Sequence, residues 1–239
     1  MNRAVIRLLV LQACFFILLS AAAQAEAPWN FKVLTVNSGG TSQGKALSVS
    51  TTDKGHVAYH QCRPEAPALW LEIQTEAGKS IPLQLGVPRL DRYRHARPAV
   101  AILSPDLPPC TEKLPFTVPE GMGVQLLSTH DLKSAQYRDD YTGIVSWRFE
   151  KMHFTPLTTG SCYAVVFSPS VAEGSVPETK VWLTVGQGSS FRLSDLLAVY
   201  GNNLSIRSFF EEAVYISQVF SSSIIMVILT LIGVIVAIV

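Results

Sequence analysis

Charged residues are scarce in this sequence and nearly balanced in sign. Only 15% of the 239 residues are charged, with 19 Lys and Arg against 18 Asp and Glu. A nucleic-acid-binding protein needs a clustered excess of positive charge, because phosphate contacts supply much of its affinity. The composition therefore gives no support for nucleic acid as a partner. A nucleotide phosphate loop is also incomplete, because Ala46 ends the near-match 39–46 where the motif requires a Ser or Thr hydroxyl.

Cysteine is equally rare, with four residues in the chain. Cys14 lies in an N-terminal apolar run, which leaves Cys62, Cys110 and Cys162 as disulfide candidates. Outside the cytoplasm such a bridge can form and persist. Three cysteines allow one internal bridge and leave one thiol over, and the sequence does not decide which two pair. Cys110 follows a Pro-rich stretch, which we expect to form a loop.

The N-terminal residues follow the pattern of a secretory signal peptide. Arg3 and Arg7 precede an apolar run, and small residues then lead to Ala23-Gln24-Ala25, which matches an Ala-x-Ala cleavage site. We therefore expect residues 1–25 to direct export and to be removed. The alternative is an N-terminal membrane helix that is never cleaved.

Residues 213–239 contain no charged side chain and end in a long apolar run. A helix rises about 1.5 Å per residue, so roughly 20 apolar residues cross the hydrocarbon core of a bilayer. We expect one C-terminal transmembrane helix here, after a linker and a short juxtamembrane helix in residues 187–212. The alternative is that the tail is exchanged for a lipid anchor at the small residues 201–203.

The start of the helix that leads into the membrane and the transmembrane helix itself each carry a finer pattern. Ser208 and Glu211 match a capping box that would begin the helix leading into the membrane, and Phe209 and Phe210 would then lie at the lipid–water interface. Within the transmembrane helix, small or weakly polar residues recur on one stripe, which predicts close packing against another helix. These residues are Ser223, Thr230, Gly233 and Ala237.

Residues 26–186 have the pattern of many short strands. Runs rich in Val, Ile, Leu, Thr and aromatic residues are separated by turn signals such as 53–55. Strict alternation, as in 69–74, is typical of a strand with one buried face. Trp70, Trp147 and Trp182 lie in such runs and are expected in the core. The expected strands are 31–36, 46–50, 56–61, 68–74, 81–87, 99–103, 124–128, 144–154, 162–167 and 180–185. The prediction is a mainly β fold, with a single β-sandwich-like or barrel-like ectodomain.

Three metal-capable side chains lie close together in one of these strands. His56, His60 and Cys62 share one face by the period of two, and such ligands suit zinc or copper. A strand with surface histidines and a disulfide-bonded Cys62 explains the same residues, and we expect no bound metal or other cofactor. A hydrolase or metal-dependent enzyme would instead require several residues to converge in one pocket. The candidates are His56, His60, His130, His153, Asp139 and Asp140.

Arginine is clustered in a short segment between two prolines. Arg89, Arg92, Arg94 and Arg97 surround a single acidic residue, Asp91. The segment is expected to be an exposed loop, either simply solvated or in contact with anionic lipid headgroups, an acidic glycan or an acidic partner.

Together these patterns predict an exported, membrane-anchored β-domain that acts by binding, as a receptor-like module or an accessory subunit of a membrane complex. Its ectodomain would be extracellular, lumenal or periplasmic. The expected partners are membrane lipid and, through the C-terminal helix, a membrane protein or a second copy. The alternatives are the anchored enzyme described above and a self-assembling structural component of an envelope.

Overall fold

The computed structural model describes residues 31–50, 52–139, 143–186 and 204–212. In this part of the chain no helix is long and apolar enough to cross a membrane. The predicted signal peptide and transmembrane helix lie outside the described residues, and so do the helix-packing residues Ser223, Thr230, Gly233 and Ala237.

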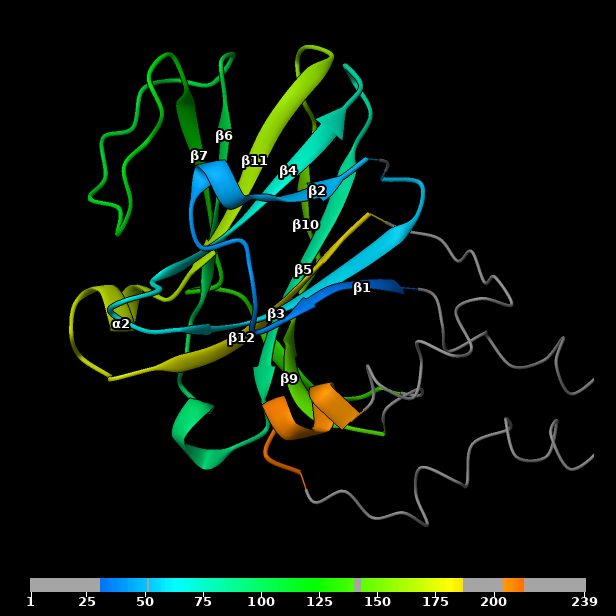
Figure 1. Cartoon of the computed structure of the whole chain (residues 1–239), viewed down its shortest axis with the longest axis vertical. Helices are drawn as coiled ribbons and strands as arrows, with labels where there is room; N and C mark the ends of the chain where they lie inside the picture. The colour runs from blue at the N-terminus through cyan, green and yellow to red at the C-terminus, as the bar shows by residue number, and fades with distance from the viewer. Residues whose placement is uncertain (1–30, 51, 140–142, 187–203, 213–239) are drawn as a thin grey trace, which may run out of the picture.

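The described residues form two β-sheets packed face to face (Figure 1). The larger sheet has seven strands in the order β1-β3-β12-β5-β9-β8, with β10 also paired to β5, and the smaller has five in the order β2-β4-β11-β6-β7. The strands are β1 (Phe31–Val36), β2 (Leu47–Val49), β3 (Gly55–Cys62), β4 (Ala68–Thr75), β5 (Ile81–Pro88), β6 (Ala99–Ser104), β7 (Gly123–Ser128), β8 (Ser134–Arg138), β9 (Val145–Phe149), β10 (Met152–Phe154), β11 (Gly160–Phe167) and β12 (Thr179–Val185). The fold is thus a mainly β sandwich, as the sequence predicts.

The chain crosses between the sheets at each of its first five strand connections. Strands β1, β3 and β5 belong to the seven-stranded sheet, whereas β2, β4 and β6 belong to the five-stranded one. Because of this alternation, β1 pairs with β3 and β2 pairs with β4 in parallel, while the other pairings are antiparallel. Between residues 31 and 186, the described part of the chain contains three short helical pieces: η1 (Gln43–Lys45), η2 (Asp91–Tyr93) and α2 (Pro169–Ala172).

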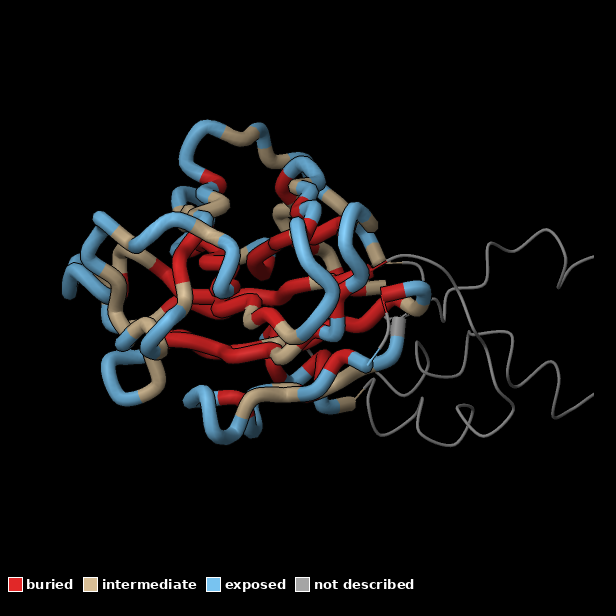
Figure 2. Tube along the Cα trace, turned by 90° about the horizontal axis from the view of Figure 1, so that it is seen from above, coloured by how far each residue is buried: buried red, intermediate tan, exposed pale blue. Residues whose placement is uncertain are grey.

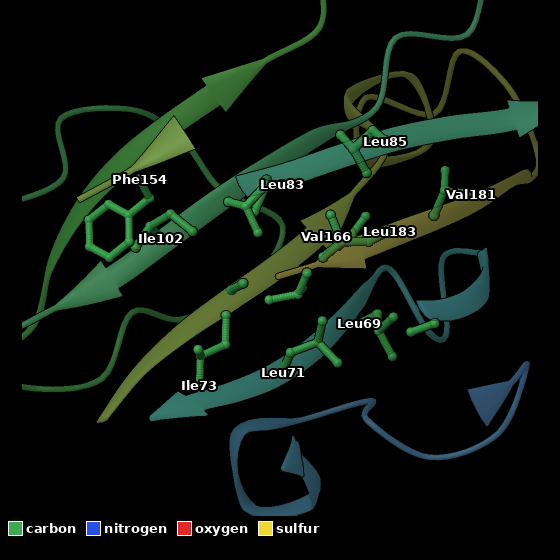
Figure 3. Packing of buried hydrophobic residues seen from close by; sticks show 14 of the residues in the cluster. Leu69, Leu71, Ile73, Leu83, Leu85, Ile102, Phe154, Val166, Val181 and Leu183 are labelled. Carbon is green, nitrogen blue, oxygen red and sulfur yellow. The ribbon is translucent and has the colours of Figure 1, made fainter. Parts of the chain in front are cut away.

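The main core lies between the two sheets. Period-two alternation directs every second residue of a strand inward, so Leu69, Leu71 and Ile73 of β4 face Leu83 and Leu85 of β5 (Figure 3). These side chains are at most 1% exposed. Figure 2 shows the buried strands enclosed by exposed loops. Burial of this apolar layer supplies the main drive for folding.

Both outer faces of the sandwich are partly covered, and each covering segment packs over a tryptophan of the sheet. Trp70 lies on the outer face of the five-stranded sheet, edge-on to Phe116 at 5.2 Å between ring centroids, under the long loop between β6 and β7. Trp182 lies on the outer face of the seven-stranded sheet, under residues 204–212. Trp147 is partly buried beside the main core. Burial of Trp70 and Trp182 is confirmed, but they belong to the outer layers and not to the central core.

The predicted strands agree with the structure except at one place. The expected strand 144–154 is two strands, β9 and β10, both paired with β5. Between the pairs Gly86–Arg148 and Leu83–Met152, two residues of β5 face three residues of the other segment. This extra residue is a β-bulge, which divides the run. Strand β8 was not predicted.

Candidate functional site

Residues 204–212, here called the docked segment, pack on the outer face of the seven-stranded sheet. Residues 204–209 are helical, and the turn that follows places Glu211 in the left-handed region at φ 61°. The amide of Phe210 donates to the Ile206 carbonyl at 3.0 Å, and that of Glu212 donates to the Arg207 carbonyl at 3.0 Å. Figure 1 shows this segment in orange against the lower end of the sheet.

Apolar contacts hold the docked segment in place. Ile206, Phe209 and Phe210 are 2%, 6% and 5% exposed, and they form one cluster with Trp182 of β12. The ring of Tyr59 from β3 meets Phe209 and Phe210 edge-on, at centroid distances of 5.7 and 5.9 Å. Aromatic pairs in this geometry are favourable beyond the area they bury.

A glycine in β5 makes room for this cluster. A Cβ added at Gly86 would lie 2.2 Å from the Trp182 ring. The indole therefore lies directly over the backbone of its neighbouring strand, where only glycine leaves space for it.

Charged side chains form a second set of contacts, here called the clasp: Arg92, Lys180 and Glu211. The Lys180 ammonium of β12 donates to the Phe209 carbonyl at 2.7 Å and to Glu211 Oε1 at 2.7 Å. Arg92 donates to the same carboxylate oxygen. The Lys180 side chain is only 9% exposed. Because a buried charge is costly unless it is paired, the Glu211 carboxylate is needed to compensate the ammonium. The Lys180 hydrogen bond, followed by that from Arg92, lowers the pKa of Glu211.

A further ion pair lies beside the clasp. The Arg207 side chain is 6% exposed and its guanidinium is 3.3 Å from Glu212 Oε2. Both ends of the 211–212 turn are therefore held by basic groups. The predicted positions of this segment are wrong in two respects: Ser208 lies within the helix instead of capping it, and Phe209 and Phe210 are buried against protein instead of lipid.

The docked segment also completes a groove of about 540 Å³ on this face. Its polar lining comes from Asn37 after β1, Gln61 of β3, Lys180 of β12, and Ser205 and Ser208 of the docked segment. The Gln61 amide nitrogen of the backbone donates to Asn37 Oδ1 at 3.1 Å, which fixes the Asn37 side chain. The Gln61 side-chain nitrogen donates to Glu178. The remaining amide groups and hydroxyls of the lining suit a neutral polar group or an extended peptide backbone.

The four arginines predicted as an anionic-partner patch lie in one loop, residues 88–98, here called the basic loop. Tyr93, within this loop, is buried. The Arg92 guanidinium carbon lies 4.7 Å from the centroid of the Tyr93 ring, and the same guanidinium donates to Glu211. Arg97 donates to the Ala96 carbonyl at 2.9 Å and is half-buried. Arg89 and Arg94 are exposed. Arg92 and Arg97 are thus held by contacts with other residues, although Arg92 is also exposed.

The predicted metal residues share a face as expected, but they do not converge. His56, His60 and Cys62 all point inward from β3, and four residues of strand separate the histidines by roughly 13 Å. His56 Nδ1 and His60 Nε2 each hydrogen-bond to a carbonyl, of Lys54 at 2.9 Å and of Ala66 at 3.0 Å. Burial lowers the pKa of both rings. The described residues contain no group of three or more His, Cys, Asp and Glu that could hold a metal ion.

The three candidate disulfide cysteines carry free thiols and lie in separate places. Cys62 bonds to the backbone of Ser168, just beyond β11, whereas Cys162 lies six residues earlier, roughly 20 Å along the strand. Cys110 packs on the outer face of the five-stranded sheet. A disulfide requires Cα atoms within about 7 Å, so Cys62 and Cys162 do not bridge in this arrangement. Burial raises the pKa of each of these two thiols to about 12.

The candidate catalytic residues are scattered over the described structure. His130 is exposed after β7, 4.0 Å from Asp131, and His153 is exposed on β10, where Ser80 contacts it at 3.3 Å. Asp139 lies in the turn after β8, and Asp140 lies outside the described residues. His56 and His60 lie in the core, so the candidates within the described residues form no common pocket.

The sequence also contains a Gly-x-Ser-x-Gly pattern at residues 40–44. Its Ser42 is exposed and precedes the single turn η1, after which strand β2 begins. A nucleophile elbow requires a strand, a sharp turn and then a helix. A phosphate loop at 39–46 would need a helix directly after it, but strand β2 follows instead. The structure around these residues therefore fits neither a nucleophile elbow nor a phosphate loop.

Comparisons with known proteins add little. No family model matches the chain, and the comparison with curated proteins gives no match. One similar solved structure is CorA, described as a surface-associated copper-binding protein important in copper acquisition by Methylomicrobium album BG8. The alignment has 12% identity and a TM-score of 0.32, and it covers 59% of this chain and 98% of that one. At this TM-score the likeness carries no argument about fold or function.

Proposed function

We propose that this protein is an exported, membrane-anchored β-sandwich that acts by binding a membrane-protein partner on the extracytoplasmic side. The observation that supports this most directly is the position of the docked segment. It packs on the sandwich through residue 212, and the predicted transmembrane helix begins at residue 213. The sandwich is then held against the bilayer surface instead of being carried on a flexible stalk.

The same nine residues complete the polar groove. Ser205 and Ser208 line it from the docked segment, and Asn37, Gln61 and Lys180 line it from the sheet. The groove is therefore on the part of the sandwich nearest the proposed membrane entry, within reach of the extracytoplasmic portion of a neighbouring membrane protein. Its amide and hydroxyl groups match the hydrogen-bonding groups of a peptide backbone.

The docked segment also favours a retained transmembrane helix over a lipid anchor. Exchange of the tail at residues 201–203 would remove residues 204–212. The aromatic ring of Tyr59 and the indole of Trp182 would lose their cover, and the nearly buried Lys180 would lose both of its hydrogen-bond partners. Exposure of these two aromatic rings to water is unfavourable, whereas the uncovered Lys180 ammonium would be hydrated.

Purification of the full chain in mild detergent tests the binding function. Ser208→Tyr would fill the groove, and Ser48→Tyr, on an exposed position of β2 in the other sheet, is the matched control. We expect a specific partner to be recovered with the wild type and with Ser48→Tyr, and to be lost with Ser208→Tyr. Equal recovery with both variants would contradict the role of the groove. Recovery of further copies of this chain, lost on Gly233→Ile, would favour self-assembly instead.

A further inference from the structure

The basic loop and the docked segment are joined, although they lie far apart in the sequence. Arg92 in the loop and Glu211 in the segment are 119 residues apart and share a charged hydrogen bond. Figure 1 shows the helical turn after β5 and the orange segment at the same end of the molecule. Residue 212 follows directly, so the loop is fixed beside the point where the chain leaves the sandwich.

The exposed charges of the loop lie close to this point. Arg89 and Arg94 are within three residues of Arg92, a distance of at most about 11 Å along the chain. This is comparable to the Debye length of about 10 Å in 0.1 M salt, so an anionic membrane surface beside residue 212 would attract both guanidinium groups with partial screening. Neither side chain forms an ion pair with the described residues, and both point their charge to solvent.

The groups around the loop leave it basic. Asp91 is the single acidic residue within it, against four arginines. Of the acids on the packed elements, Glu211 pairs with Lys180 and Arg92, Glu212 pairs with Arg207, and Glu178 lies beside Arg63. Asp139 is held in the turn after β8, and Arg138 ends that strand. Apart from Asp91, the neighbouring acids are thus matched by neighbouring bases, and Arg89 and Arg94 outnumber this one unmatched acid.

We propose that the basic loop binds the anionic headgroups of phospholipids, with Arg89 and Arg94 as the contacting residues. The clasp holds the loop in position, because Glu211 fixes Arg92 and thereby the loop beside the membrane entry. This inference rests on the proposed membrane attachment. Each basic residue beside an anionic surface strengthens attachment roughly fivefold, so two arginines together give an effect of roughly 25-fold.

The test uses the full chain reconstituted in nanodiscs, either of phosphatidylcholine alone or of phosphatidylcholine mixed with phosphatidylglycerol. Amide hydrogen exchange of peptides covering residues 88–98 is measured in both. We expect slower exchange in the anionic discs, and loss of this difference in the double variant Arg89→Gln/Arg94→Gln and in high salt. Lys113→Gln is the matched control, because Lys113 is exposed in the loop that covers the five-stranded sheet, far from the clasp. It should behave as the wild type.

The outcomes distinguish failure of the lipid contact from failure of the membrane attachment. If the chain inserts but the loop exchanges equally in both lipids, the lipid contact is wrong and the membrane attachment stands. The same conclusion follows if Lys113→Gln removes the effect as fully as the double variant. Protection by soluble polyglutamate in neutral discs, without protection by anionic lipid, would assign an acidic macromolecular partner and overturn the lipid proposal. Failure of the full chain to insert would instead overturn the proposed function itself.

Discussion

Removal of the Glu211 carboxylate tests the clasp most sharply. In Glu211→Ala the Lys180 ammonium keeps the Phe209 carbonyl but loses its counter-charge, on a side chain that is only 9% exposed in the wild type. A hydrogen bond to a charged group contributes about 1.5–3 kcal/mol, and the carboxylate is 41% exposed, so we take the lower part of this range. The docked segment should lose about 2 kcal/mol of local stability, a factor of roughly 30 in its opening equilibrium.

Lys180→Met is the informative partner variant. It removes the same ion pair but leaves no buried charge behind, because a partly exposed Glu211 can be hydrated. We expect Lys180→Met to open the segment less than Glu211→Ala does. The assay is native-state hydrogen exchange of the Phe210 and Glu212 amides, which are bonded within the segment. A change below threefold in Glu211→Ala, or a larger effect of Lys180→Met, would refute the argument about the uncompensated ammonium.

The same carboxylate predicts a pH dependence. Because its pKa in the folded state is lower than the ordinary value of 4.5, the contribution of Glu211 is complete above pH 4.5 and is lost as the pH falls through the lower folded value. Protection of the docked segment should therefore decrease in acid in the wild type and vary less in Glu211→Ala. Parallel profiles would show that another group controls the segment.

Three further predictions concern the sandwich. Gly86→Ala should lower the free energy of unfolding by about 1–3 kcal/mol in urea titration, because the new methyl group collides with the Trp182 ring; Gly44→Ala, with nothing within 4 Å, should have little effect. The pKa of His60 is lowered by burial, so its contribution is complete above pH 6.5 and is lost as the pH falls below that value. The melting temperature should then fall less steeply from pH 7 to pH 5 in His60→Gln, and an unchanged slope would exclude His60. Iodoacetamide should modify Cys110 in the native protein but neither Cys62 nor Cys162, which become reactive only in denaturant.

The strands of the sandwich were predictable because burial on one face imposes a period of two. Leu69, Leu71 and Ile73 show that period and lie in the core. Strand β8 lacks it: Ser134–Arg138 contains no apolar run, and it forms the edge of the seven-stranded sheet, paired on one side with β9. An edge strand is held by backbone pairing, which leaves little trace in composition. The division of 144–154 depends on a register shift against β5, and a single sequence does not contain that information.

The docked segment shows where the pattern becomes ambiguous. An aromatic, amphipathic stretch beside a transmembrane helix has the same composition whether its apolar face meets lipid or protein. The location of Phe209 and Phe210 against Tyr59 depends on the outer face of a sheet assembled from distant strands. Likewise, the pairing of Lys180 and Arg92 with Glu211 spans 31 and 119 residues. The arginine cluster was visible in the sequence, but its position beside residue 212 was not.

Fractionation of cells that express the full chain tests the export and membrane attachment of the sandwich. We expect recovery in membranes after carbonate extraction, a mature N-terminus at Glu26, and protease cleavage of the sandwich from the extracytoplasmic side. A chain ending at residue 212 should carry the same N-terminus and be released in soluble form. Recovery of the full chain in the cytosol with residues 1–25 still attached would contradict the account.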